Sequence, residues 1–225
     1  MDKLDCVVSL TTWKGRINDP KLPRVLYRLL NQKTNFNYKV VLVLSKEEFG
    51  EDYKLPDVLE FLTFDEKFEI LWTDKNTKAL KKLDPTMEKY PDVPIITLDD
   101  DELVSVYAVE AIMTDHKETP DMILGGLCGP CNNIIRVSFI RLFPPNSLAN
   151  IPSHYFGEYF QYTNDDEWNG LRAALQGTKS RRMKYNVVEN MEYGDQSVAF
   201  KSVYNKFNFS AAVQKFRKDH PEYFK

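Results

Sequence analysis

One run of the sequence indicates the architecture of the whole protein: Asp92-Val93-Pro94-Ile95-Ile96-Thr97-Leu98-Asp99-Asp100-Asp101-Glu102. A β-rich apolar run that ends in consecutive acidic residues is typical of a buried strand whose C-terminal end opens onto solvent, because unpaired ionised carboxylates are not stable in a core. In an open α/β sheet, ligands bind in the crevice beyond the carboxyl ends of the strands. The stretch therefore predicts a ligand site at its acidic end.

The acidic side chains of this stretch have a predicted arrangement. Alternation along an extended backbone places Asp99 and Asp101 on one side and Asp100 on the other. Two carboxylates that face the same way repel each other unless a cation lies between them, and such oxygen ligands suit Mg²⁺ or Mn²⁺ carrying substrate phosphates. The alternative interpretation is an acidic start to a helix predicted from Leu103 to Thr114, whose dipole favours Asp and Glu.

Length and composition indicate a folded protein. The 225 residues are 43% hydrophobic and 13% aromatic, which suffices to bury a core as one domain. The formal net charge is −3, and the basic residues are scattered along the chain. Because nucleic acid is bound by clustered Lys and Arg, we expect no nucleic-acid partner.

The first residues of the sequence and its cysteines indicate the cellular compartment of the protein. No basic and apolar leader precedes the segment Cys6-Val7-Val8-Ser9-Leu10, and no apolar stretch has the length of a membrane span. Three cysteines do not make the disulfide framework of a secreted protein. We therefore expect a cytoplasmic protein.

Apolar patterns in the first half alternate between strand and helix. The run Val40 to Leu44 is apolar on both faces, as expected for a parallel strand covered by helices. The repeat predicts an α/β fold, a Rossmann-like and mostly parallel sheet flanked by helices, followed beyond Asn132 by a less regular part. Strands are predicted from Leu4 to Trp13, Tyr38 to Ser45, Phe68 to Thr73 and Met122 to Leu124, and helices from Pro20 to Leu30, Pro56 to Leu62 and Lys78 to Tyr90 with a break near Pro85.

The second half is predicted to contain three helices. They run from Asp165 to Leu175 with Asn164 as N-cap, from Gly194 to Tyr204, and from Ser210 to Lys218. The last of them is basic and amphipathic. It has two interpretations: a peripheral contact with the anionic inner face of a membrane, or an ordinary terminal helix docked on the core.

Several blocks, taken in order, resemble a GT-A fold glycosyltransferase of the small bacterial type found with cell-surface polysaccharide genes. The resemblance covers roughly the first half of the chain and, in the second half, only an acidic helix start. The blocks are Val8-Ser9-Leu10-Thr11-Thr12-Trp13 with Arg16, Leu42-Val43-Leu44-Ser45, Lys82-Leu83-Asp84-Pro85 with Tyr90-Pro91-Asp92, Thr97-Leu98-Asp99-Asp100-Asp101, and Asp165-Asp166-Glu167-Trp168.

This resemblance implies one domain, in which residues 1–126 bind a nucleotide sugar and residues 127–225 form the acceptor side. It implies transfer of a sugar from a nucleotide diphosphate donor, most often linked to uridine diphosphate (UDP), to a hydroxyl group of a carbohydrate or lipid-linked glycan, with Mn²⁺ or Mg²⁺ as cofactor. A non-catalytic nucleotide-sugar-binding protein on the same fold is the alternative, since fold alone does not decide function.

The resemblance also implies roles for individual residues. Asp99 and Asp101 are the expected metal ligands, and Asp99 and Asp100 the expected contacts to ribose and diphosphate. In an inverting displacement Asp166 is the expected general base with Asp165 as the alternate, and the alternative interpretation is that these acids only favour a helix start. The remaining expected donor contacts are Thr11, Thr12, Trp13, Arg16, Asn76 and Lys82.

One tetrapeptide, Cys128-Gly129-Pro130-Cys131, points to a different chemistry. It matches the active site of thioredoxin-like oxidoreductases, in which a helix N-terminus lowers the pKa of the first thiol. Here the following segment from Asn132 to Val137 has the pattern of a strand. A zinc site would need two more ligands, and no second close pair of cysteines or histidines is present. We therefore expect structural thiols in a tight Gly-Pro turn, with thiol-disulfide exchange as the alternative.

Overall fold

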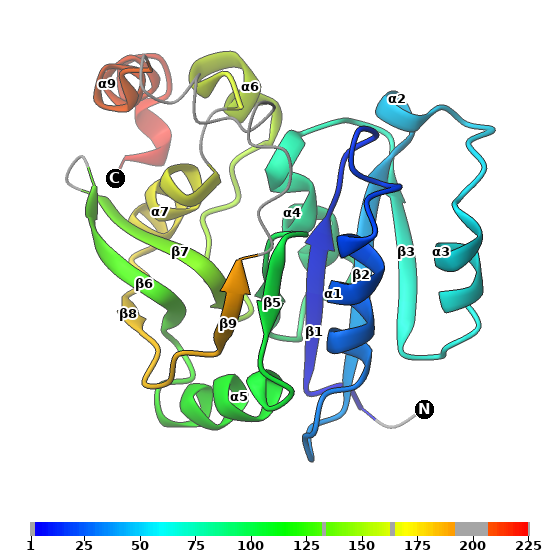
Figure 1. The fold of residues 1–225 in the computed structure, drawn as a ribbon. Coiled ribbons are helices and arrows are strands. Elements are labelled where there is room, and N and C mark those ends of the chain that lie inside the picture. The colour runs from blue at the N-terminus through cyan, green and yellow to red at the C-terminus, as the bar shows by residue number, and fades with distance from the viewer. Residues whose placement is uncertain (1–2, 132–133, 163–164, 192–206, 225) are drawn as a thin grey trace.

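A seven-stranded mixed sheet runs through the computed structural model (Figure 1), which describes residues 3–131, 134–162, 165–191 and 207–224. Its strand order is β3-β2-β1-β4-β7-β6-β8. The strands are β1 Cys6–Thr11, β2 Tyr38–Ser45, β3 Phe68–Thr73, β4 Ile95–Thr97, β6 Ile123–Cys131, β7 Ile134–Phe143 and β8 Ser180–Arg182. A second sheet pairs β5 Glu102–Val104 with β9 Val188–Met191.

The first four strands in this order, β3, β2, β1 and β4, are parallel, and the inner three are buried on both faces. The side chains of Val40 to Leu44 in β2 have no exposed surface, as the apolar run predicted. Alternate residues of β1 and β2 belong to two separate hydrophobic clusters, so each face of the sheet has its own core. One cluster contains Val8, Leu10, Val40, Leu42 and Leu44, and the other contains Val7, Val41, Val43 and Ile95.

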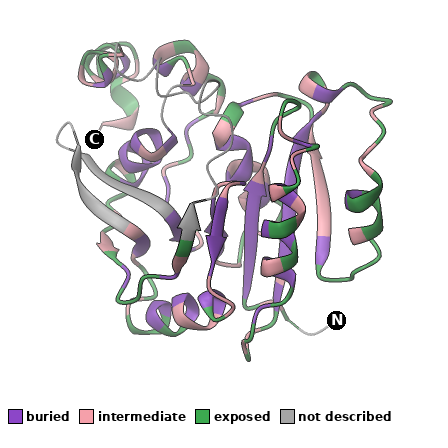
Figure 2. Ribbon diagram, in the orientation of Figure 1, coloured by how far each residue is buried: buried purple, intermediate pink, exposed green. Residues whose placement is uncertain are grey.

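Helices cover the sheet, and Figure 2 shows the central strands buried while α3 at one edge is largely exposed. Loops at the carboxyl ends of the parallel strands lead into α2, η1 and the acidic turn, so these elements meet at one edge of the sheet (Figure 1). The helices are α1 Lys21–Leu30, α2 Lys46–Phe49, α3 Asp57–Leu62, the 3₁₀ helix η1 Lys78–Lys82, α4 Asp84–Lys89, α5 Ala108–Glu118, α6 His154–Phe160, α7 Asp165–Gln176, α9 Phe209–Asp219 and the 3₁₀ helix η3 Pro221–Tyr223.

An aromatic cluster joins α6, α7 and α9. Trp168 of α7 stacks on Phe156 at 5.6 Å between ring centroids and lies 6.1 Å from Phe216 of α9. Phe209 and Phe216 are buried there, so the apolar face of the basic terminal helix packs on the protein's own core. In the described residues, no helix is long and apolar enough to cross a membrane. The helix predicted from Gly194 to Tyr204 and the N-cap Asn164 lie outside the described residues.

The structure corrects the helix predicted from Leu103 to Thr114. The chain instead forms strand β5, whose Leu103 pairs with Asn190 of β9, and helix α5 begins only at Ala108. Local acidic and apolar residues suited a helix start, but pairing with a distant strand decided the conformation, and such pairing is not visible in local sequence.

The region around the cysteine tetrapeptide also differs from the prediction. The turn predicted at Cys128 to Cys131 lies within the nine-residue strand β6, where Cys128 pairs with Val137 and Cys131 with Ile134 of β7. The strand predicted after the tetrapeptide is confirmed as β7. The tetrapeptide therefore lies in a hairpin and not at a helix N-terminus, where a redox thiol would be activated.

Candidate functional site

The acidic residues after β4 form what we call the aspartate turn, Asp99 to Asp101. Thr12, after β1, donates a hydrogen bond to Oδ2 of Asp100 at 2.6 Å. Arg16 donates from Nη2 to Asp100 at 2.6 Å and from Nη1 to Asp101 at 2.9 Å. The prediction that Asp99 and Asp101 lie on one side and Asp100 on the other is thus wrong. The backbone turns at Asp100 and Asp101, so these two share Arg16, while Asp99 pairs with Lys82.

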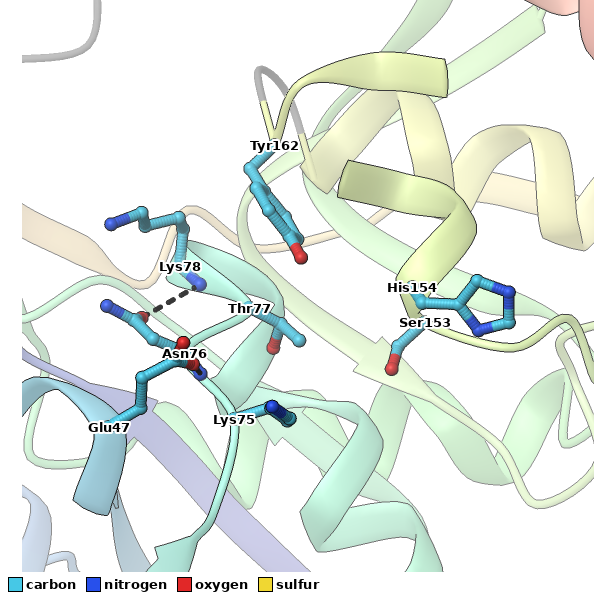
Figure 3. Close-up of a pocket in the computed structure, with 8 residues that line it drawn as sticks. All are labelled: Glu47, Lys75, Asn76, Thr77, Lys78, Ser153, His154 and Tyr162. Carbon is cyan, nitrogen blue, oxygen red and sulfur yellow. Dashed lines mark hydrogen bonds between the residues drawn. The ribbon is translucent and has the colours of Figure 1, made fainter. Parts of the chain in front are cut away.

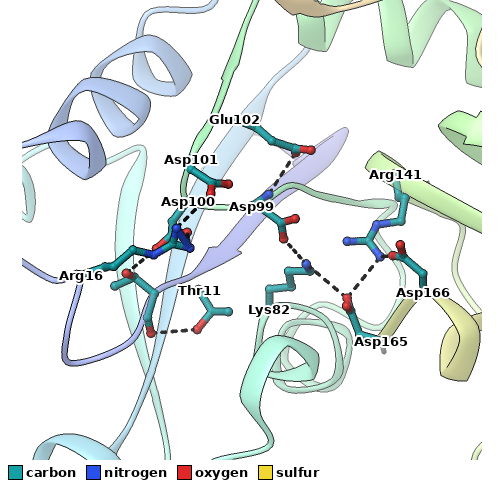
Figure 4. Close-up of polar contacts among 11 residues, drawn as sticks. Thr11, Arg16, Lys82, Asp99, Asp100, Asp101, Glu102, Arg141, Asp165 and Asp166 are labelled. Carbon is teal, nitrogen blue, oxygen red and sulfur yellow. Dashed lines mark hydrogen bonds and ion pairs between the residues drawn. The ribbon is translucent and has the colours of Figure 1, made fainter. Parts of the chain in front are cut away.

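Asp99 contacts Lys82, the last residue of η1 (Figure 4). The Lys82 ammonium lies 2.5 Å from Oδ1 of Asp99 and 3.2 Å from Oδ2 of Asp165 at the start of α7. The Lys82 side chain is only 2% exposed. Burial and the nearby Arg141 lower the pKa of Lys82, but the two carboxylates raise it more, so the net shift is upward and the ammonium stays charged.

Arg141 of β7 extends the same network to Asp166. Its Nη1 lies 3.2 Å from Oδ2 of Asp165 and also donates to Oδ1 of Asp166. The Arg141 side chain is 2% exposed, whereas that of Asp166 is 20% exposed. A continuous chain of contacts therefore runs from Asp99 through Lys82, Asp165 and Arg141 to Asp166 (Figure 4).

The two neighbouring acids of α7 have opposite pKa shifts. Burial raises the pKa of Asp165, but Lys82 and Arg141 outweigh it and lower this pKa to about 2. Burial raises the pKa of Asp166 to about 7, because the charges of Arg141 and Lys82 do not offset it and the charges of Asp165 and Asp99 add to it. Asp165 is thus a permanent counterion of Lys82 and Arg141, while Asp166 has the proton affinity of a general base that works near neutral pH.

Glu102 is buried beneath the aspartate turn and bonds to its backbone. Its Oε2 accepts a hydrogen bond from the backbone N–H of Asp99 at 3.1 Å, and its side chain is fully buried. Burial, with the charge of Asp99, raises the pKa of Glu102 to about 8. A neutral Glu102 lowers the number of negative charges that Lys82 and Arg141 must balance.

The aspartate turn has the donor set of a site for Mg²⁺ or Mn²⁺ bound to a diphosphate. Burial raises the pKa of Asp101, and the negative charge of Asp99 adds to this rise while Arg16 opposes it. Within the described residues, no three His, Cys, Asp or Glu side chains are grouped to hold a metal ion. Mg²⁺ commonly takes only one or two carboxylates and fills its other positions with phosphate oxygens and water, so Asp99 and Asp101 fit such a site.

The loop after β1 supplies further candidates. The hydroxyl of Thr11 bonds to the backbone oxygen of Val43 at 2.7 Å, which ties β1 to β2. Trp13 is 38% exposed, and its indole lies across Gly15, where an added Cβ would come within 2.2 Å of the ring. Glycine at this position therefore makes room for the indole, which stays partly exposed.

A pocket of about 500 Å³ lies between the loop after β3 and helix α6 (Figure 3). Asn76, a predicted donor contact, lines this pocket and accepts a hydrogen bond from the backbone N–H of Lys78 at 3.2 Å. Asn76 N–H in turn donates to Glu47 at 2.7 Å. No described contact joins Asn76 to the aspartate turn.

Sequence reasoning missed Arg141 and the buried pair of Lys81 with Glu48. Lys81 is 2% exposed and bonds Glu48 at 2.7 Å, which fixes η1 against α2. Arg141 interrupts the apolar segment Ile140-Arg141-Leu142-Phe143, and an isolated charge in a buried strand signals a buried ion pair. The sequence therefore indicated that Arg141 is ion-paired, but it did not indicate that the partners are Asp165 and Asp166.

Comparison with known proteins places the fold. No family model and no curated protein matches this sequence. S. aureus TarS 1-349 in complex with UDP-GlcNAc aligns with a TM-score of 0.52 and 12% identity over 87% of this chain and 61% of that chain. PcManGT, a mannosyltransferase from Pyrobaculum calidifontis in complex with GDP-Man and Mn²⁺, aligns with a TM-score of 0.53 and 12% identity over 84% of this chain and 57% of that chain.

These similarities confirm the predicted GT-A-like α/β fold, and at 12% identity they show the fold alone. The chain spans about three fifths of the length of each of the two structures.

Proposed function

We propose that this protein is a glycosyltransferase that moves a sugar from a nucleotide diphosphate donor, a UDP-sugar, to a hydroxyl group of a carbohydrate or lipid-linked glycan. The observation that carries the proposal is the contact of Lys82 with both Asp99 and Asp165. It joins the acids at the carboxyl end of β4, where α/β sheets bind ligands, to the acids at the start of α7. The nucleotide sugars bound by TarS and PcManGT support the same class of donor.

Departure of the nucleoside diphosphate is the first step that the site must assist. Negative charge grows on the leaving oxygen as the glycosidic bond breaks, and fixed positive groups stabilise it best. Lys82 is held by two carboxylates and is charged, so it is placed to donate a hydrogen bond to a phosphate oxygen near Asp99. Mn²⁺ or Mg²⁺ held by Asp99 and Asp101 would add positive charge to the diphosphate when bound.

Donor recognition is proposed for the loop after β1 and the aspartate turn. Arg16 and Thr12 fix the carboxylate of Asp100, which then accepts hydrogen bonds from ribose hydroxyl groups. The partly exposed indole of Trp13 is proposed to stack on the nucleobase, since aromatic rings stack on bases of any sequence.

Asp166 is the proposed general base of an inverting displacement. Its raised pKa and its 20% exposed carboxylate suit a group that takes the acceptor hydroxyl proton. Asp165 is less suited, because it is held by Lys82 and Arg141 and its pKa is lowered to about 2. Asp165 instead positions the two cations.

A hydrolysis screen tests this proposal. Purified protein is incubated with UDP- and GDP-sugars in Mn²⁺, in Mg²⁺ or in excess chelator, and release of the nucleoside diphosphate is measured. We expect slow release from one UDP-sugar that stops with chelator and in Asp166→Asn, but not in Asp92→Asn, an exposed acid outside the network. Tight nucleotide-sugar binding with no release from any donor would assign the protein to the non-catalytic class.

A further inference from the structure

The pocket beside α6 carries chemistry that the transfer step does not use. Its volume of about 500 Å³ is in the range of small-ligand sites. The hydroxyl groups of Thr77, Ser153 and Tyr162 surround its open space in Figure 3. Within the described residues none of these three hydroxyls has a hydrogen-bond partner, so all three are available to a ligand.

Four lysines near the pocket divide into two classes. Lys81 and Lys82 are buried and paired, with Glu48 in the first case and with acids of the network in the second. Lys75 and Lys78 line the pocket, are exposed, and have no ion-pair partner in the described part of the chain. Glu47, the acid in the lining, accepts a hydrogen bond from the backbone of Asn76. The lining therefore contains two lysines and one glutamate, a formal net charge of +1, together with neutral hydroxyl groups.

Three residues around the pocket have a positive φ, a backbone conformation that residues other than glycine rarely adopt. Lys78 has φ 55°, and Gln161 and Tyr162 both have φ 53°. A left-handed conformation at a residue with a side chain is unfavourable and concentrates at ligand sites. Gly157 makes the arrangement possible, because a Cβ there would lie 2.4 Å from the Tyr162 ring. The Tyr162 ring thus packs against α6 at Gly157 and lines the pocket.

We propose that this pocket binds the acceptor, and that the acceptor is an anionic sugar carrying a phosphate or carboxylate group. Hydroxyl groups and an aromatic ring suit a sugar, and two unpaired lysines suit its negative group. Lys78 and Lys82 are the two ends of η1, about 8 Å apart at the rise of a 3₁₀ helix. Lys78 at one end of η1 lines the pocket, and Lys82 at its other end contacts Asp165 at the start of α7, so η1 links the pocket to the helix that carries the proposed base. This inference rests on the proposed transferase function.

Binding of small probes to the full chain tests the pocket directly. Glucose 6-phosphate, glucuronate, glucose and inorganic phosphate are titrated by calorimetry without donor. We expect the two anionic sugars to bind at least about tenfold more tightly than glucose and than inorganic phosphate, since charge-assisted bonds and sugar contacts add. The double variant Lys75→Gln/Lys78→Gln should lose this preference. Lys54→Gln, an exposed lysine outside the lining, should keep it.

A second variant and a second ligand separate the possible results. Gly157→Ala displaces the Tyr162 ring and should weaken glucose 6-phosphate binding while the fold, followed by circular dichroism, is kept. UDP binding in Mn²⁺ should be unchanged in all pocket variants. Parallel loss of UDP affinity would make this a donor pocket and overturn the proposal, as would equal affinity for glucose and glucose 6-phosphate. Absence of UDP binding in the wild type would count against the transferase, while the sugar titrations would still decide whether the pocket binds anionic sugars.

Discussion

The ammonium of Lys82 lies 3.2 Å from the carboxylate of Asp165, which places the end of η1 against the start of α7. The two residues come from the two halves of the chain that were predicted to bind donor and acceptor. Because Lys82 also contacts Asp99, removal of either acid leaves a buried cation with one counterion fewer. The network is therefore expected to respond as a unit, with effects of single substitutions that do not add.

Asp101→Ala should abolish the metal-dependent part of nucleoside diphosphate binding. The substitution removes one of two carboxylates and leaves a cation too few hard ligands. Calorimetry of UDP with Mn²⁺, Mg²⁺ or chelator measures the effect. If the wild type binds UDP equally well with metal and with chelator, or if the variant binds UDP as tightly as the wild type does with metal, Asp101 is not a metal ligand.

Cys128→Ser and Cys131→Ser should leave donor hydrolysis within a few-fold of wild type. Both residues lie in strand β6, away from the helix N-terminus that would activate a thiolate. An insulin-reduction assay provides the second measurement, and the wild type should show no activity. Reduction that disappears in either variant would establish the redox alternative in place of ours.

Asp115→Asn should destabilise the fold without changing nucleotide affinity. Asp115 is 1% exposed and bonds Arg181 of β8 at 2.7 and 3.2 Å. Burial raises the pKa of Asp115, but Arg181 lowers it more, so the net shift is downward. The ionised acid therefore stabilises the protein above the unfolded pKa, and this contribution is lost as pH falls through the folded pKa. We expect a cost of about 3 kcal/mol at pH 7, measured by urea unfolding, that shrinks toward pH 3.

Local sequence was sufficient for much of the parallel sheet. Strands β2 and β3 have the predicted bounds, because each is a short apolar run between clear turn signals. The α/β class and the acidic end of β4 follow from the same pattern. The continuation of β6 beyond Leu124 to Cys131 was missed, because Gly125, Gly126 and Pro130 normally mark turns and only pairing with a neighbouring strand overrides them.

The partners of the acidic residues were beyond local sequence. Alternation assumes an extended backbone, but the chain turns at Asp100, so Asp100 and Asp101 share Arg16. Arg141 lies in a strand that follows the acidic turn by some forty residues, and its contact with Asp166 depends on how β7 packs against α7.

Arg141→Lys should move the acidic limb of the rate profile to higher pH. The Arg141 charge lowers the pKa of Asp166, although burial dominates and leaves that pKa raised. A shorter side chain with one ammonium contacts both acids less well, so the pKa of Asp166 should rise further. We expect a displacement of roughly one pH unit, equal to about 1.4 kcal/mol of lost interaction. An unchanged profile with a lowered melting temperature would give Arg141 a structural role alone.

Asp166→Asn should separate chemistry from folding. Asparagine keeps the size of the side chain but removes its basicity, so transfer should fall by about 10² to 10⁴-fold, the usual contribution of a positioned base. In the wild type the rate should rise with pH through about 7 as Asp166 loses its proton. The variant should lose this limb. UDP affinity should change little, because the aspartate turn is untouched.

Asp165→Asn is the matched control for this prediction, since it alters the adjacent acid of the same helix. Asp165 contacts both Lys82 and Arg141, so its loss leaves two buried cations short of a counterion and should lower the melting temperature more than Asp166→Asn does. Stability and rate are measured for both variants at several pH values. If Asp166 only favours the start of α7, asparagine replaces it adequately, transfer stays within a few-fold of wild type, and the pH limb survives. The base would then have to be sought at another acid.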